Sequence, residues 1–228
     1  MNPRLKFSFF LLFVGILTLY AGAGTFDIEQ LATMNLASLR TAIPLSAIFF
    51  LILMAFAIKL PVFPFHTWLP DAHTDAPTAV SVILAGVLLK MGGYGMIRLS
   101  VSLFPGVARD WAWLLVILAV VNVLYGAAVT LRQTDMKKLI AYSSVSHMGY
   151  VLLGIFALNQ VSLTGATLQM ISHGVVTGLL FAMVGVVYDH SHLRNLSQMG
   201  GLARQMPVAA VVFSIAGLAS LGLPGTSG

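Results

Sequence analysis

Long apolar runs recur along this chain of 228 residues and limit its possible folds more than any other feature. A helix that crosses about 30 Å of hydrocarbon needs about 20 apolar residues. Because no water reaches that depth, the backbone must pair its own donors and acceptors, as a helix does. We therefore expect helical segments at residues 5–24, 41–70, 76–100, 110–131, 136–158, 162–188 and 207–223.

The composition also indicates a membrane protein that crosses the bilayer several times. Hydrophobic residues make up 58% of the chain and charged residues only 8%, whereas soluble domains carry about a quarter charged residues. Such a surface must face lipid or other membrane subunits over most of its area. We expect an all-α fold, a polytopic transmembrane helix bundle that forms a single domain over residues 1–228.

The first apolar run allows two interpretations. Arg4 and Lys6, the run that follows them and the small residues of Ala21–Ala23 resemble a secretory signal peptide. The run from Phe7 to Tyr20 nevertheless continues to Ala23, and further spans follow it. A first transmembrane helix is the favoured interpretation.

Cysteine content and charge exclude several functions. The chain has no cysteine, so it holds no disulfide, no thiolate-bound iron–sulfur cluster and no cysteine nucleophile. Its net charge of +5 is scattered over short loops and forms no nucleic-acid-binding stripe. The pairs His66/His73 and His190/His192 lack the spacing of helical metal ligands, so we expect no metal site.

Basic residues predict the orientation, because short cytoplasmic loops are enriched in them. The side of the N-terminus carries more of them than the other side, so we expect the N-terminus in the cytoplasm. The residues counted on that side are Arg4, Lys6, Arg132, Lys137, Lys138, Arg194 and Arg204, against Arg40, Arg98 and Arg109 opposite.

Lys59 lies inside the second apolar segment, where an ammonium group is costly unless it meets water or a carboxylate. At 1.5 Å per residue this segment would reach about 45 Å, too long for one straight crossing. Pro61 and Pro64 should open the helix just after Lys59. We expect a broken helix beside a hydrated cavity that His66 and Thr67 also line, with snorkelling of Lys59 to an interface as the alternative.

Lys90 lies near the middle of the next span, where snorkelling is harder. Gly92, Gly93 and Gly95 follow it and should permit close helix packing. "GGYG" follows no strand, so a dinucleotide site is not indicated.

Two histidines occupy the following spans. His147 lies in a helix whose first half is rich in serine, and His173 lies near Gln169 and Ser172. An imidazole can accept and donate a proton near neutral pH, so both are candidates for a proton relay. Hydrogen-bonded packing is the alternative role for each.

Two short polar stretches are interpreted as turns and caps rather than as catalytic groups. Asp71, His73 and Asp75 in "PDAHTDAP" should form a turn and a helix start. Asp135 should cap the helix that begins beside Lys137.

Three strings carry a family resemblance: "KLPVFPFHTWLPDAHTDAPTAVSVILAGVLLKMGGYGMIRL", "LRQTDMKKLIAYSSVSHMGYVLLGI" and "LQMISHGVVTGLLF". They resemble the antiporter-like proton-pumping subunits of NADH:quinone oxidoreductase, respiratory complex I, and within them the type called subunit M or chain 4. This resemblance implies two inverted five-helix repeats, each with one broken helix. "KLPVFPF" would break the first and "LGLPGTSG" the second.

The resemblance implies roles for single residues. Lys59 matches the lysine of the broken helix, whose charge responds to a neighbouring glutamate. Lys90 matches the central lysine, and His147 and His173 match histidines of the hydrophilic axis. NADH, FMN, the iron–sulfur clusters and quinone would belong to partner subunits of the membrane arm and beyond, with no cofactor held by this chain.

The chain departs from the family at both ends. The glutamate expected near Lys59 and an ionisable residue expected beyond Gly228 are absent, so we expect a fragment. A bacterial inner membrane is the expected location, or a thylakoid or mitochondrial inner membrane if the chain is organellar. Three alternatives stay open: a subunit of a multi-subunit Na⁺/H⁺ antiporter, the membrane arm of a hydrogenase, and an inactive scaffold.

Overall fold

The computed structural model describes residues 3–36, 39 and 41–227, and within them the chain is helical except for turns and one isolated bridge between Asp135 and Asn195. The all-α prediction is confirmed. Five stretches of the described residues are long and apolar enough to cross a membrane. They are α1 (Pro3–Ala23), the span Thr78–Val101, α7 (Pro105–Thr130), α8 (Met136–Phe156) and α9 (Gln160–Ser191).

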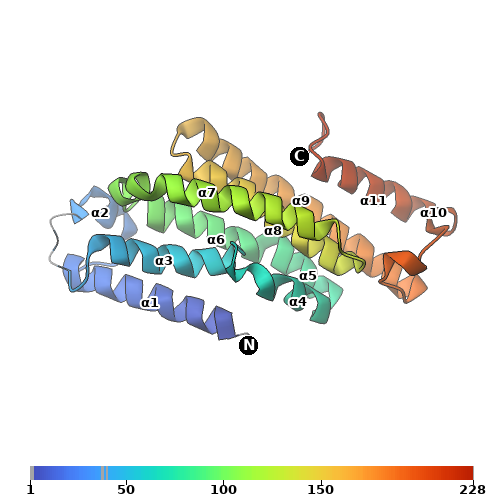
Figure 1. Ribbon diagram of the computed structural model, residues 1–228, viewed down its shortest axis with the longest axis horizontal. Helices are drawn as coiled ribbons and strands as arrows, with labels where there is room; N and C mark the ends of the chain where they lie inside the picture. Colours follow the sequence, from blue (N-terminus) through green and yellow to red (C-terminus); the bar gives the residue numbers. More distant parts are fainter. Residues whose placement is uncertain (1–2, 37–38, 40, 228) are drawn as a thin grey trace.

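Shorter helices complete the bundle, which Figure 1 shows as rods lying side by side along one axis. The two short apolar helices are α3 and α11, and α11 packs on α9 through Ala216 and Ala219. α2 lies at one end of the bundle and α10 at the other (Figure 1). Their bounds are α2 Ile28–Thr33, α3 Leu45–Lys59, α4 Trp68–Asp75, α10 Leu202–Gln205 and α11 Pro207–Ser220, with 3₁₀ turns at Phe65–Thr67 and Leu196–Gln198.

The first run forms a helix at the edge of the bundle that packs against α3, as a transmembrane helix can. A Cβ at Gly15 of α1 would lie 2.8 Å from Ile52 of α3, so the two backbones approach closely. Leu5, near the other end of α1, packs against the buried cluster of Trp68, Leu69, Leu89 and Val145. These contacts support the transmembrane interpretation of the run over that of a cleaved leader.

The second segment is two helices joined by a break, as the prolines predict. α3 ends at Lys59, and α4 begins at Trp68 after a turn through Pro61 and Pro64. The indole Nε1 of Trp68 donates to the carbonyl of Ile58 at 2.7 Å, which satisfies an acceptor near the end of α3. Side chains therefore replace the backbone partners that the break removes.

The stretch "PDAHTD" forms α4, so the prediction that Asp71, His73 and Asp75 lie in a turn is wrong. Pro70 sits in the first turn of α4, where its missing N–H breaks no helical bond. At the other end of α4 the Nζ of Lys137 donates to the carbonyl of Ala76 at 2.7 Å. The Asp135 cap is confirmed, since its carboxylate accepts from the N–H of Lys138 at 3.0 Å.

The span Thr78–Val101 is not one regular helix. π-helical turns at Leu84–Leu88 and Met96–Val101 flank α6 (Leu89–Gly95) and follow α5 (Thr78–Ile83). Such turns widen a helix and often occur at functional sites. A Cβ at Gly92 would lie 2.9 Å from the backbone N of Leu60, which confirms close packing at this glycine.

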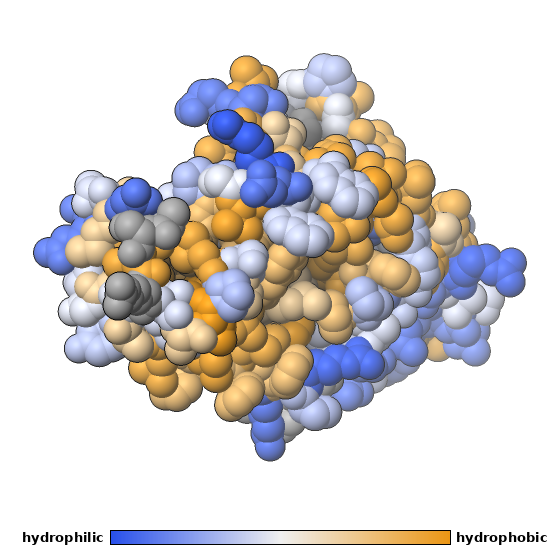
Figure 2. Space-filling view, turned by 60° about the vertical axis from the view of Figure 1, so that its left-hand side comes forward, coloured by the Kyte–Doolittle hydropathy of each residue, from blue (hydrophilic) through white to orange (hydrophobic). Residues whose placement is uncertain are grey.

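Basic residues gather at the two ends of the bundle. The chain after α9 meets the α7–α8 turn, where the N–H of Met136 donates to the carbonyl of Arg194 at 3.1 Å. The opposite end carries Arg98 and Arg109, while Arg40 lies outside the described residues. Figure 2, which brings that opposite end forward, shows hydrophobic side chains over much of the surface, with hydrophilic ones in separate groups.

Helices α7 and α8 approach each other most closely at two glycines. A Cβ at Gly126 would lie 2.6 Å from the backbone N of Ser146, and one at Gly149 would lie 2.8 Å from the backbone N of Val123. Between these points the Oγ of Ser146 donates to the carbonyl of Val123 at 2.9 Å. α7 and α8 therefore form a closely packed pair.

We expect Gly126→Ala to force α7 and α8 apart and to lower the melting temperature of the purified protein in detergent. Overpacking of this kind costs about 1–3 kcal/mol. Gly106→Ala, in the same helix but with open space around its Cβ, is the matched control and should melt as the wild type does. Equal melting temperatures for the two variants would contradict the close approach.

Candidate functional site

Lys90 and His173 meet between α6 and α9. The Nζ of Lys90 lies 2.8 Å from the Nδ1 of His173, and it also donates to the carbonyl of Ala85, in the π-helical turn before α6. His173 is buried, with 4% of its surface exposed. The Oγ1 of Thr177 donates to the backbone carbonyl of His173, one turn earlier in α9. An ammonium group and an imidazole in direct contact can share and pass one proton.

His147 continues this line of polar groups on α8. Its ring centroid lies 5.2 Å from that of His173, with the two ring planes inclined by 54°. Its Nδ1 lies 3.2 Å from the Nε2 of Gln169, and its Nε2 lies 3.4 Å from the Oγ of Ser220. Both nitrogens of His147 therefore have polar partners, which come from α9 and α11.

A cavity of about 910 Å³ opens beside the two histidines. It lies between α7, α8, α9 and the end of α11, and polar side chains form part of its wall. Water can enter a polar space of this size, whereas a small apolar void stays dry. The polar side chains that line it are Thr130, Ser143, Ser146, His147, Ser162, Gln169, Ser172, His173 and Ser220.

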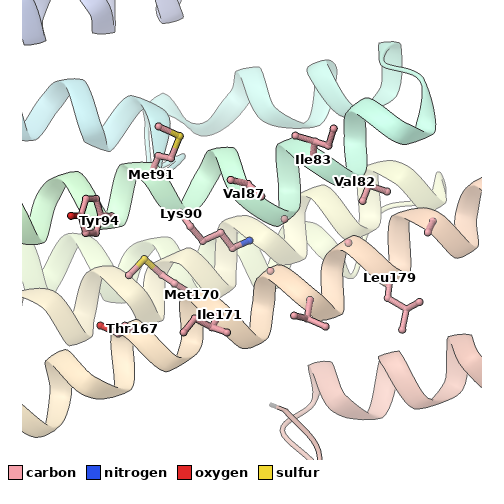
Figure 3. A pocket seen from close by; sticks show the side chains of 15 residues that line it. Val82, Ile83, Val87, Lys90, Met91, Tyr94, Thr167, Met170, Ile171 and Leu179 are labelled. Atoms are coloured by element: carbon pink, nitrogen blue, oxygen red, sulfur yellow. The ribbon is translucent and has the colours of Figure 1, made fainter.

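A second cavity, of about 900 Å³, lies on the other side of Lys90 and is almost wholly apolar. Figure 3 shows the Lys90 side chain extending from α6 between Val87 and Met91 on its own side and Met170 and Ile171 on α9. The aliphatic stem of Lys90 thus lines an apolar groove, while its ammonium group reaches the carbonyl of Ala85 and the imidazole of His173.

Lys59 stands apart from this cluster. It is half-buried at the C-terminal end of α3, where the helix dipole favours a cation. No hydrogen bond or ion pair joins its ammonium group to any residue that the structure describes. Of the four predicted site residues, the structure brings Lys90, His147 and His173 together and leaves Lys59 outside.

His66 does not lie beside Lys59 in a hydrated cavity. It is 1% exposed and packs against the rings of Phe63, Tyr125 and Tyr142, with centroid distances of 5.8, 5.0 and 6.2 Å. Neither Lys59 nor His66 lines the polar cavity or the apolar one. The break is therefore filled with aromatic side chains at the position of His66.

The sequence interpretation missed two members of the cluster. Gln169 was noted as a neighbour of His173, yet its amide contacts His147 on the adjacent helix. Ser220 ends an apolar run and gave no signal of its own. Within the described residues, no three histidine, aspartate or glutamate side chains converge as metal ligands would.

The model of the transmembrane region of the NADH:quinone oxidoreductase/Mrp antiporter family matches residues 5–228. The chain belongs to this family. The family resemblance of the three sequence strings is thereby confirmed.

Individual relatives agree with the family assignment. The NADH-quinone oxidoreductase subunit M of Rickettsia conorii is 47% identical over 223 residues, which are 96% of this chain and 44% of that protein. A chain of respiratory complex I from Thermus thermophilus superposes with a TM-score of 0.86 at 31% identity, over 97% of this chain and 48% of the other. A chain of the Mrp complex from Dietzia sp. DQ12-45-1b gives 0.87 at 28% identity, over 97% and 40%. This chain thus spans less than half of each.

His73 is a further buried histidine of this family member, at the edge of the membrane-spanning helices. It is 0% exposed, and its ring stacks on Phe181 with centroids 4.2 Å apart. Burial, together with the positive charges of Lys137 and Lys90, lowers the pKa of His73 to about 4. His73 is therefore neutral in the folded protein at neutral pH.

We expect the free energy of unfolding to fall as the pH falls from 6.5 towards 4. In this range His73 binds a proton in the unfolded chain but not in the folded one. The loss of stability amounts to about 3 kcal/mol, is complete below pH 4 and is absent above pH 7. Between pH 6.5 and pH 4, the melting temperature should fall less steeply with pH in His73→Leu than in the wild type. His190→Leu, at an exposed position, should keep the wild-type slope; an unchanged slope in His73→Leu would contradict the assignment.

Proposed function

We propose that the chain is part of a proton-translocating membrane subunit of an NADH or NAD(P)H:quinone oxidoreductase. The observation that carries the proposal is the contact of 2.8 Å between Lys90 Nζ and His173 Nδ1, with His147 next in line. Three groups that can carry protons thus follow one another across α6, α9 and α8. The similarity to subunit M of Rickettsia conorii supports the same assignment.

The proposed mechanism is electrostatic. A change of charge near Lys59 shifts the protonation equilibrium of Lys90, because charges interact strongly across a medium of low dielectric constant. Lys90 then passes a proton to the Nδ1 of His173, and the two imidazoles and water of the polar cavity carry it to the region of Ser220. Lys59 acts through its charge rather than by direct transfer, since it has no polar contact with the other three.

No redox step is assigned to this chain. NADH, FMN, iron–sulfur clusters and quinone would act in partner subunits, and the energy of quinone reduction would reach this chain through other membrane-arm subunits. The many exposed large hydrophobic side chains, among them Phe9, Phe13 and Trp113, suit contact with lipid or with such subunits. The chain would lie in a bacterial inner membrane, or in a thylakoid or mitochondrial inner membrane if it is organellar.

A Na⁺/H⁺ antiporter subunit is the second candidate, because the Mrp complex from Dietzia superposes as well as complex I does. The distinction is measurable in the ion that moves. Transport in the proposed oxidoreductase should follow quinone reduction and be independent of sodium, whereas an antiporter should exchange sodium for protons without a quinone.

We expect Lys90→Ala and Lys59→Ala each to lower proton pumping and quinone-linked turnover about tenfold or more in membranes that hold the assembled complex. The amount of assembled complex should stay unchanged. Arg132→Ala removes an exposed cation at the end of α7 and serves as the control that pumps normally. Wild-type pumping in both lysine variants would reject the mechanism.

The N-terminus and the α7–α8 turn are expected in the cytoplasm, and the α8–α9 turn on the opposite side. Because residues 1–228 contain no cysteine, single cysteines introduced as Arg132→Cys and Gln160→Cys are the only thiols in this part of the subunit. A membrane-impermeant thiol reagent should label Arg132→Cys in inside-out vesicles and Gln160→Cys in right-side-out vesicles. The reverse labelling would invert the proposed orientation.

A further inference from the structure

Asn122 is a buried polar residue in the middle of α7 that belongs neither to the cluster of Lys90 nor to the cavity beside it. Its exposed fraction is 0%. Its Oδ1 accepts from the backbone N–H of Phe63 at 2.8 Å, and its Nδ2 donates to the backbone carbonyl of Val145 at 2.9 Å. These partners fix the orientation of the amide, since one is a donor and the other an acceptor.

The first of these bonds satisfies the break between α3 and α4. The neighbouring donors find acceptors within the same segment: Leu60 N–H bonds to Phe56 O, Val62 N–H to Ala57 O and Phe65 N–H to Val62 O. The N–H of Phe63 instead has its partner on another helix. Without Asn122 this donor would be unpaired at membrane depth, where no water replaces the lost acceptor.

The second bond reaches α8 two residues before His147. α7 and α8 form the closely packed pair described above, and the Oγ of Ser146 bonds to Val123 one residue after Asn122. Tyr125, one helical turn along α7, places its ring 5.0 Å from Phe63 and 5.0 Å from His66. One face of α7 thus contacts the break. Through its two hydrogen bonds, Asn122 joins the break to the turn of α8 that carries His147.

We propose that Asn122 is a positioning residue that holds the break, and with it Lys59, in fixed register with the His147 turn. The break is then a static kink and not a hinge. The inference rests on the proposed function for its effect on pumping, while the bond itself can be tested separately.

Hydrogen exchange measured by mass spectrometry on the assembled complex tests the bond. Asn122→Leu replaces the amide by a side chain of similar size. In this variant, exchange at the amide of Phe63, within the segment 60–67, should be about fivefold to tenfold faster. In Asn122→Asp an oxygen still faces the N–H of Phe63, so protection at that amide should stay close to wild type. Exchange over the rest of α7 and α8 should stay unchanged in both variants.

Pumping tests the consequence. Asn122→Leu should lower proton pumping and quinone-linked turnover about tenfold at an unchanged amount of complex, because a small displacement of positioned groups has a large effect on transfer. Thr18→Val, which removes a bond of 2.7 Å to the carbonyl of Val14 in α1, is the matched control. It should leave both pumping and exchange in segment 60–67 unchanged.

The outcomes separate this inference from the proposed function. Wild-type exchange at Phe63 in Asn122→Leu overturns the inference, as does faster exchange with normal pumping. Faster exchange throughout α7 and α8, or loss of assembled complex in both Asn122 variants, overturns it in favour of a packing role. If Lys59→Ala and Lys90→Ala pump normally, the proposed function fails, whatever the exchange at Phe63 shows.

Discussion

A backbone donor or acceptor at membrane depth needs a partner inside the protein, and the polar side chains of this fold are largely arranged to supply one. The indole of Trp68 and the amide of Asn122 serve the break between α3 and α4. The ammonium group of Lys90 donates to the carbonyl of Ala85 in a π-helical turn, and that of Lys137 donates to the carbonyl of Ala76 at the end of α4. The break after α3 and the π-helical turn Leu84–Leu88 thus each coincide with a side chain that completes their hydrogen bonding.

The same requirement accounts for two cations, the half-buried Lys90 and the buried Lys137. An ammonium group loses its hydration when it enters the membrane, and carbonyl oxygens return part of that stabilisation. Lys137, only 2% exposed, caps the C-terminal end of α4, where Arg194 also donates to the carbonyl of Thr74 at 3.4 Å. Positive charge at that end also suits the helix dipole. Lys137 is therefore a structural cation, whereas Lys90, with an imidazole as its second partner, has a group to which it can give a proton.

The sequence was sufficient to predict the spans and the break, because both follow from local features: runs of apolar residues and the position of Pro61 and Pro64. It also singled out Lys90, His147 and His173 from the cost of ionisable groups at membrane depth. Their order of contact depends on how α6, α8 and α9 pack, and no single helix contains that information. For the same reason, the partners of Gln169, Ser220 and Asn122 lie on other helices and could not be predicted.

One error in the sequence interpretation concerns α4. The position of Asp71, His73 and Asp75 between Pro70 and the next apolar run predicts a turn, yet these residues belong to a short helix after the break. Lys137 of α8 is buried at the end of that helix, where its Nζ donates to the carbonyl of Ala76. This arrangement follows from the packing of α4 on α8, which is a tertiary feature.

Lys59 and Lys90 lie on two elements whose backbones are in contact. No polar contact joins them, but the backbone just after Lys59 touches the helix that carries Lys90. A Cβ at Gly92 would lie 2.9 Å from the N of Leu60, so these two backbones meet one residue after Lys59 and two after Lys90. Gly92 thereby keeps the two cations on elements in direct contact, without water or flexible side chains between the backbones. In the proposed mechanism, a change in the charge of Lys59 would reach Lys90 across this contact, in a medium of low dielectric constant.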